Sequence, residues 1–122
     1  MQRRDFEQLV AEALDELPHQ FRSYVQNIAV VVEEEPSREL LESMGLWPAE
    51  TLLGLYEGVP LPERGYGFGN MLPDRITIFQ RPIEAMCRTS HEIKEAVQET
   101  VVHEFAHYFG LDDEQIDELM AE

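Results

Sequence analysis

Cysteine and basic side chains are both scarce in this 122-residue chain. The single cysteine, Cys87, cannot form an internal disulfide, and its scarcity suits a reducing compartment. Only nine Lys and Arg residues stand against 25 Asp and Glu residues, which gives a formal net charge of -16. Nucleic acids and anionic membranes would repel a chain of this charge. We therefore expect neither as a partner.

Long hydrophobic runs are also missing. The longest aliphatic run, from Ile28 to Val32, is too short to span a bilayer, which takes about 20 residues. Acidic residues near the N-terminus occupy positions that are hydrophobic in a secretory leader. We therefore expect a cytoplasmic protein with no membrane-spanning segment.

The apolar pattern that is present predicts a single α+β domain over residues 1–122. Hydrophobic residues make up 43% of the chain, which is enough for one modest core. Apolar residues spaced by three and four predict a helix from Asp5 to Leu17, ended by Pro18. Short β-branched or apolar segments bracketed by Gly, Pro or Asp predict three strands, at Ile28–Val32, Leu52–Tyr56 and Arg75–Phe79. A weaker pattern predicts a helical turn at Ser37–Met44.

Between the last two predicted strands lies a segment rich in proline and glycine. It contains G-Y-G-F-G at residues 65–69. This run does not lead from a strand into a helix, so it is a poor candidate for a phosphate-binding loop. A mobile connection or flap is the better interpretation, and its role stays open.

The most informative stretch is T-V-V-H-E-F-A-H-Y-F-G at residues 100–110. Thr89 and Glu92 form a capping-box pattern, so we expect a long helix from there to residue 108 or 109. Residues four apart lie on the same face of a helix, so His103 and His107 would project side by side, with Glu104 next to them. In this H-E-x-x-H pattern two imidazoles bind zinc and the glutamate acts as a general base.

A catalytic zinc site needs a third protein ligand. Gly110 can adopt the left-handed conformation that turns the chain back after the second histidine. The spacing then becomes H-E-x-x-H-x-x-G-x-x-D, which makes Asp113 the preferred third ligand. Asp112 and Glu114 are the nearest competitors, and Asp112 or Asp113 has the alternative role of capping a last helix through Met120.

An alternative without metal is that the two histidines are core residues. The six residues around them are uncharged, as expected if this helix lies in the core: Val101, Val102, Phe105, Ala106, Tyr108 and Phe109. Burying two imidazoles and a carboxylate without a metal would be costly, however. His19 and His91 are weaker candidates, because His91 lies about 120° around the helix from His103 and should be exposed.

The sequence resembles the minimal zincins, small and mostly bacterial proteins related to zinc metallopeptidases. The likeness rests on V-V-H-E-F-A-H-Y-F-G-L-D-D-E at 101–114, with support from G-L-Y-E-G-V-P-L at 54–61 and L-P-D-R-I-T-I-F-Q-R-P-I at 72–83. It implies a compact zincin-like fold, in which a small mixed sheet of three to four strands packs against a long metal-binding helix with flanking helices. It also implies a Zn²⁺ cofactor held by His103, His107 and Asp113, with Glu104 as general base.

The function implied by this resemblance is hydrolysis of a peptide or protein substrate. In larger zincins an edge strand beside the metal pairs with the substrate, and Ile76–Phe79 is our candidate for that strand. Those enzymes continue into a lower subdomain with a methionine-bearing turn, whereas this chain ends nine residues after Asp113, and we assign Met120 to core packing. The alternative is therefore a non-catalytic zinc-binding or interaction domain, and a partner protein that completes the cleft is a further expectation.

Overall fold

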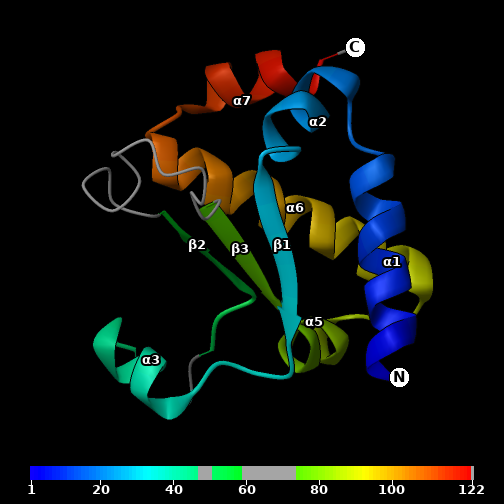
Figure 1. Cartoon of the computed structure of the whole chain (residues 1–122), viewed down its shortest axis with the longest axis vertical. Helices are drawn as coiled ribbons and strands as arrows, with labels where there is room; N and C mark the ends of the chain where they lie inside the picture. The colour runs from blue at the N-terminus through cyan, green and yellow to red at the C-terminus, as the bar shows by residue number, and fades with distance from the viewer. Residues whose placement is uncertain (47–50, 59–73, 122) are drawn as a thin grey trace, which may run out of the picture.

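The computed structural model describes residues 1–46, 51–58 and 74–121, so the glycine-rich run at 65–69 lies outside the described residues. In this part of the chain, helices and strands together form an α+β fold, as predicted (Figure 1). In chain order the elements are α1 (Arg3–Asp15), α2 (His19–Val25), β1 (Ile28–Glu33), α3 (Arg38–Ser43), β2 (Gly54–Glu57), β3 (Asp74–Phe79), α5 (Gln80–Met86), α6 (Ser90–Phe109) and α7 (Asp113–Met120).

The three strands form one mixed sheet in the order β1-β3-β2. β1 pairs with β3 in parallel and β2 pairs with it antiparallel, so that Val30 and Tyr56 are both registered with Ile76. The prediction that Ile76–Phe79 is an edge strand was therefore wrong. These residues belong to β3, which is paired along both sides and has no backbone edge left to offer a peptide. Among the described strands, β2 is the edge strand nearer to the histidines.

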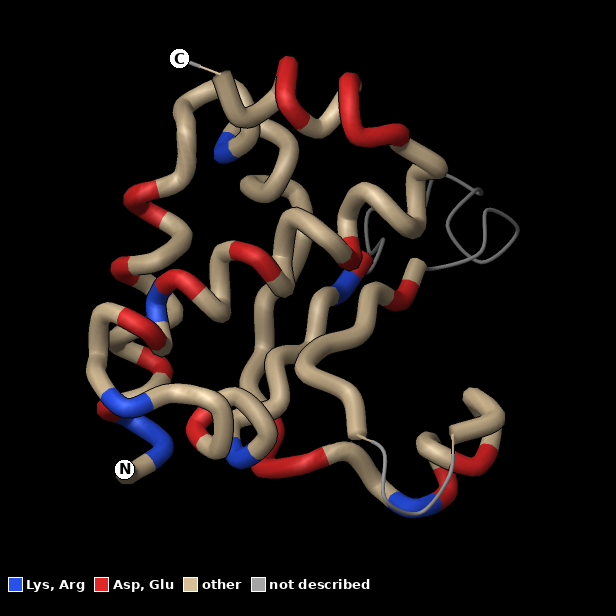
Figure 2. Tube along the Cα trace, turned by 180° about the vertical axis from the view of Figure 1, so that it is seen from behind, with Lys and Arg blue, Asp and Glu red and all other residues tan. Residues whose placement is uncertain are grey.

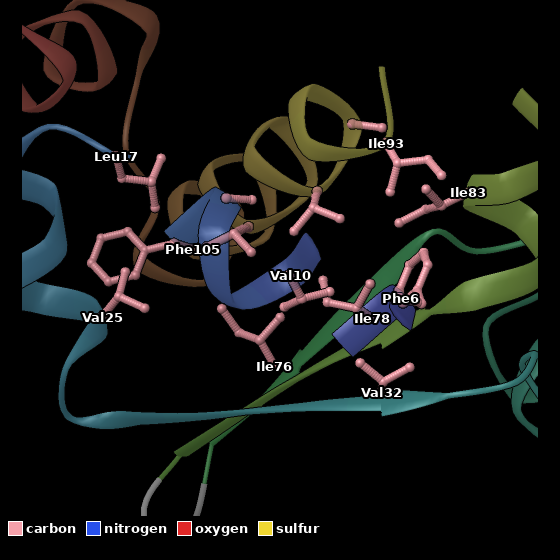
Figure 3. Close-up of a cluster of buried hydrophobic side chains, with 14 of the residues drawn as sticks. Phe6, Val10, Leu17, Val25, Val32, Ile76, Ile78, Ile83, Ile93 and Phe105 are labelled. Atoms are coloured by element: carbon pink, nitrogen blue, oxygen red, sulfur yellow. The ribbon is translucent and has the colours of Figure 1, made fainter. Parts of the chain in front are cut away.

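Helices α1 and α6 pack against each other over one face of the sheet (Figure 3). The predicted stripe of α1 is buried as expected, with Phe6, Val10 and Ala13 at most 5% exposed. They meet Ile76 and Ile78, which alternate along β3 and are both fully buried. The core is therefore a layer of aliphatic and aromatic side chains between sheet and helices, and it holds α6 in place.

Two short helices were not predicted. α2 follows Pro18 and buries Phe21 and Val25, which are one helical turn apart. α5 contains Pro82 in its first turn, where the missing N–H costs no hydrogen bond. Seven-residue helices give too little periodicity for a sequence pattern to reveal them.

Both ends of α6 agree with the sequence prediction. Thr89 and Glu92 form a complete capping box at its start. At its end Gly110 has a φ of 68°, and the N–H groups of Gly110 and Leu111 donate to the carbonyls of His107 and Ala106. The chain therefore turns sharply just after the second histidine.

Charge is spread over the molecule and not gathered in one patch. Acidic residues occur on most of the helices, including α1, α3, α6 and α7, while basic residues are few (Figure 2). Within the described ranges, no helix has both the length and the apolar character needed to cross a membrane.

Helix α6 runs alongside β2 with a regular register. A Cβ atom on Gly54 would lie 2.6 Å from Thr100 Cγ2, the N–H of Tyr56 bonds Glu104, and a Cβ atom on Gly58 would clash with the Tyr108 hydroxyl. Each step of four residues on the helix (about 6 Å) matches two residues of the strand (about 6.7 Å). The two glycines of G-L-Y-E-G are thus the positions where the helix comes closest.

We predict that Gly54→Ala destabilises the protein by about 1–3 kcal/mol, because the added methyl overlaps Thr100 Cγ2 and the Thr77 carbonyl. Urea unfolding would measure the change. Adding Thr100→Ser removes Cγ2 and should recover part of the loss, while keeping the hydroxyl bond to the Ala96 carbonyl. A Gly54→Ala protein as stable as the original would contradict the close approach.

Candidate metal centre

His103 and His107 lie one turn apart near the C-terminal end of α6, and both are exposed. Their ring centres are 6.5 Å apart and their planes differ by 29°. Both border a cavity of about 550 Å³ between α6 and β2, which Tyr56, Tyr108 and Met44 also line; we call it the histidine cavity. The structure therefore brings the two predicted imidazoles to one open face.

The spacing of the two rings fits a shared metal ion after a small adjustment. Because a Zn–N bond is about 2.0–2.1 Å long, two imidazoles on one tetrahedral zinc have ring centres about 5 Å apart. The observed 6.5 Å is wider than this by about 1.5 Å. Both side chains are exposed, so rotation about their χ angles can close the difference. The donor type and the spacing of the pair suit zinc.

Glu104 lies beside the pair and is held by the edge strand. Its Oε1 accepts a hydrogen bond from the backbone N–H of Tyr56 at 3.1 Å, and its side chain is half-buried. It lines the same cavity as the two histidines. The strand thus holds the carboxylate at the wall of the cavity that both histidines border.

The third ligand is not assembled with the pair. Within residues 1–46, 51–58 and 74–121, no group of three or more His, Cys, Asp or Glu side chains is placed to hold a metal ion. Asp112 is the cap of α7: its carboxylate accepts from the N–H of Gln115 at 2.8 Å. Asp113 is the first residue of that helix, and both it and Glu114 are exposed. Capping therefore falls to Asp112, and Asp113 as third ligand stays a prediction.

Comparison with known proteins decides the family. The family model described as zincin-like metallopeptidase matches residues 25–122, which include all the elements that build the site. The chain belongs to the zincin-like metallopeptidase family. No curated protein matches this chain in sequence.

A solved structure shares the fold. It is a conserved hypothetical protein from Thermus thermophilus, with 21% sequence identity and a TM-score of 0.55. The similarity covers 89% of this chain and 94% of that one. At this identity it supports the fold alone.

The environment of the zincin-like helix differs in part from the expected core setting. Val101, Phe105 and Ala106 are buried, but Tyr108 and Phe109 are about half exposed, so the prediction that they lie in the core was wrong. The reason is position: the last turn of α6 lies beyond the buried core residues, and both rings contact Tyr56 of β2 instead. His91 is exposed and pairs with Glu95, as predicted for a residue outside the metal pair.

Two tyrosines of the site were missed at the sequence level. The ring of Tyr108 stacks on that of Tyr56, with centres 4.1 Å apart, and the Tyr56 hydroxyl donates to Asp74 at 2.6 Å. Together they form one wall of the histidine cavity. The spacing of G-L-Y-E-G carried a signal, because two glycines flanking a tyrosine allow a helix to approach a strand.

A second cavity of about 340 Å³ adjoins the first. It shares Leu52, Gly54, His103 and Glu104 with the histidine cavity. Its other walls come from the preceding turns of α6 and the end of α5, and we call it the Met86 cavity after the residue there. His103 and Glu104 thus line both cavities.

Cys87 is half-buried and packs against the core. Burial raises the pKa of its thiol, and the negative charge of Glu92 raises that pKa further. It lines neither of the two cavities. This setting fits an inert, packed thiol better than a nucleophile.

We predict that alkylation of Cys87 by iodoacetamide follows a pH profile displaced upward from that of the unfolded chain. A raised pKa leaves less thiolate at any given pH, so the folded protein should react more slowly until the pH passes that pKa. Glu92→Gln should shift the midpoint back down, since glutamine keeps the capping box but removes the charge. Equal profiles for folded and unfolded protein would contradict this assignment.

Proposed function

We propose that this protein is a zinc-dependent metallopeptidase that hydrolyses peptide bonds. The observation that carries the proposal is the placement of His103, Glu104 and His107 on one cavity, with the glutamate tied to an edge strand. Family membership supports it, because the H-E-x-x-H residues lie inside the matched region. The proposed ligands are His103, His107 and Asp113.

Zinc, when bound, lowers the pKa of a water molecule from about 15.7 to near 7 and polarises the substrate carbonyl. Glu104 takes a proton from the attacking water and later transfers it to the leaving amine. The Tyr56 N–H limits the positions open to the Glu104 carboxylate. Little reorientation is then needed at the moment of proton transfer.

The peptide is proposed to lie along the outer edge of β2. The Tyr56 N–H points toward Glu104 and hence away from β3, so its carbonyl and the backbone groups of Gly54 face the same outer side. An extended peptide can pair with these groups as an added strand. This assignment replaces β3, whose two sides are already paired.

The rival function is a non-catalytic zinc site that only stabilises the fold. Such a site needs a protein side chain at the fourth metal position. The histidines instead border an open cavity, and Cys87, whose thiolate could serve as a soft fourth donor, does not line it. These observations favour catalysis over a structural role.

We predict that zinc raises the melting temperature by several degrees, since a ligand at 100 times its Kd adds about 2.7 kcal/mol of stability. His103→Ala or His107→Ala should abolish the gain, whereas His91→Ala on the same helix should keep it. Calorimetric titration would measure the affinity.

The third ligand is tested in the same titration. Asp113→Ala should weaken zinc binding, while Asp112→Ala should affect mainly helix stability. A loss of zinc binding seen only in Glu114→Ala would reassign the third ligand. Failure of the unmodified protein to bind zinc would end the proposal.

We predict that Glu104→Gln retains zinc but loses at least about 100-fold in peptide turnover. Glutamine still offers an oxygen to the Tyr56 N–H, so the local geometry should persist. Zinc content and cleavage of a fluorogenic peptide pool would be measured together, with Glu95→Gln as the matched control on the same helix. An unchanged rate in Glu104→Gln would refute the base assignment.

A further inference from the structure

We propose that the Met86 cavity is a subsite for a lysine or arginine side chain of the substrate, and that Glu99 is the residue that selects it. This inference rests on the proposed peptidase function. It extends that function by naming a substrate class, peptides with a basic residue close to the bond that is cut.

The position of the cavity ties it to the reacting groups. It opens beside His103 and Glu104 and runs along the N-terminal end of β2, where Leu52 and Gly54 form one side. A peptide lying on the outer edge of β2 places alternate side chains on the same side, spaced by about 6.7 Å. One of them can therefore enter this cavity while the main chain stays next to Glu104.

The walls match a long side chain with a charged end. Leu52, Met86 and Ala96 supply apolar surface, and Glu99 supplies a carboxylate. Lysine and arginine bury an aliphatic stem along apolar surface while their charged group seeks a partner. Met86 is 58% exposed, and its flexible thioether can pack against such a stem. A short acidic or polar side chain would neither cover the apolar surface nor offer a positive charge to Glu99.

In the described part of the chain, the Glu99 carboxylate forms no hydrogen bond or ion pair with another residue. Two basic groups of α6 have acidic partners of their own, since Lys94 bonds Glu16 and His91 pairs with Glu95. His103, four residues after Glu99, is one of the proposed zinc ligands. None of the described residues that line the Met86 cavity is lysine or arginine. Glu99 and Glu104 thus place two carboxylates on a cavity of a chain whose net charge is -16. Such a field attracts cationic peptides and repels acidic ones.

The test uses blocked hexapeptides of alanine and glycine in which arginine, norleucine or glutamate occupies each position in turn. Binding to zinc-treated Glu104→Gln protein is measured by calorimetry, so that no turnover occurs. At one position, arginine should bind about fivefold more tightly than norleucine, and glutamate more weakly than either. The arginine advantage should shrink as ionic strength rises.

Variants in the same background assign the effect to one residue. Adding Glu99→Gln should bring the ratio of arginine to norleucine binding close to one, and Glu99→Lys should make glutamate the preferred residue. Adding Glu95→Gln makes the same charge change one turn away, outside the cavity, and should leave the ratio unchanged. Thermal unfolding of each variant checks that the fold is intact.

The outcomes separate this inference from the proposed function. A Glu99-dependent preference for arginine in binding, with no cleavage by the unmodified protein, would support the subsite and refute the peptidase. Cleavage without any preference for arginine would support the peptidase and overturn the subsite. A preference that survives Glu99→Gln, or the absence of binding by every peptide, would also overturn it.

Discussion

The close packing of α6 against the edge strand β2 is the contact on which the site depends. Three successive contacts, at Gly54, Tyr56 and Gly58, fix the register of the helix along the strand. The middle contact is a hydrogen bond between the strand and Glu104, so the same register that packs the helix also places the carboxylate. His103 and His107 then face the adjoining cavity because of helical periodicity. Packing and chemistry cannot be altered independently here.

Much of this arrangement could be predicted from local sequence rules. The capping box at Thr89, the left-handed Gly110 and the Asp112 cap each depend on a few neighbouring residues, and all three occur as expected. The buried stripe of α1 and the three strands follow from periodicity. The placement of His103 beside His107 follows from helix geometry alone. Such features need no knowledge of what lies far away in the sequence.

What the sequence could not supply depends on contacts between distant segments. Strand order is one case: the sequence of β3 does not reveal that β1 and β2 pair with its two sides. The exposure of Tyr108 is another, since an apolar run looks the same whether it ends inside the core or beyond it. The hydrogen bond from Tyr56 to Glu104 joins residues 48 apart and has no signature in either segment. Asp113 is placed by a bend whose direction the motif alone does not fix.

The short edge of β2 limits what main-chain pairing can contribute to substrate binding. β2 spans only Gly54–Glu57, and in an antiparallel pair every second residue directs its backbone groups outward. Of these outward groups, the Tyr56 N–H is already bonded to Glu104. In the described part of the chain, few backbone bonds therefore remain for a peptide, and each adds only about 1 kcal/mol net. Under the proposed function, side-chain contacts in the two cavities would then supply most of the discrimination between peptides, which gives the proposed role of Glu99 more weight than the length of the strand.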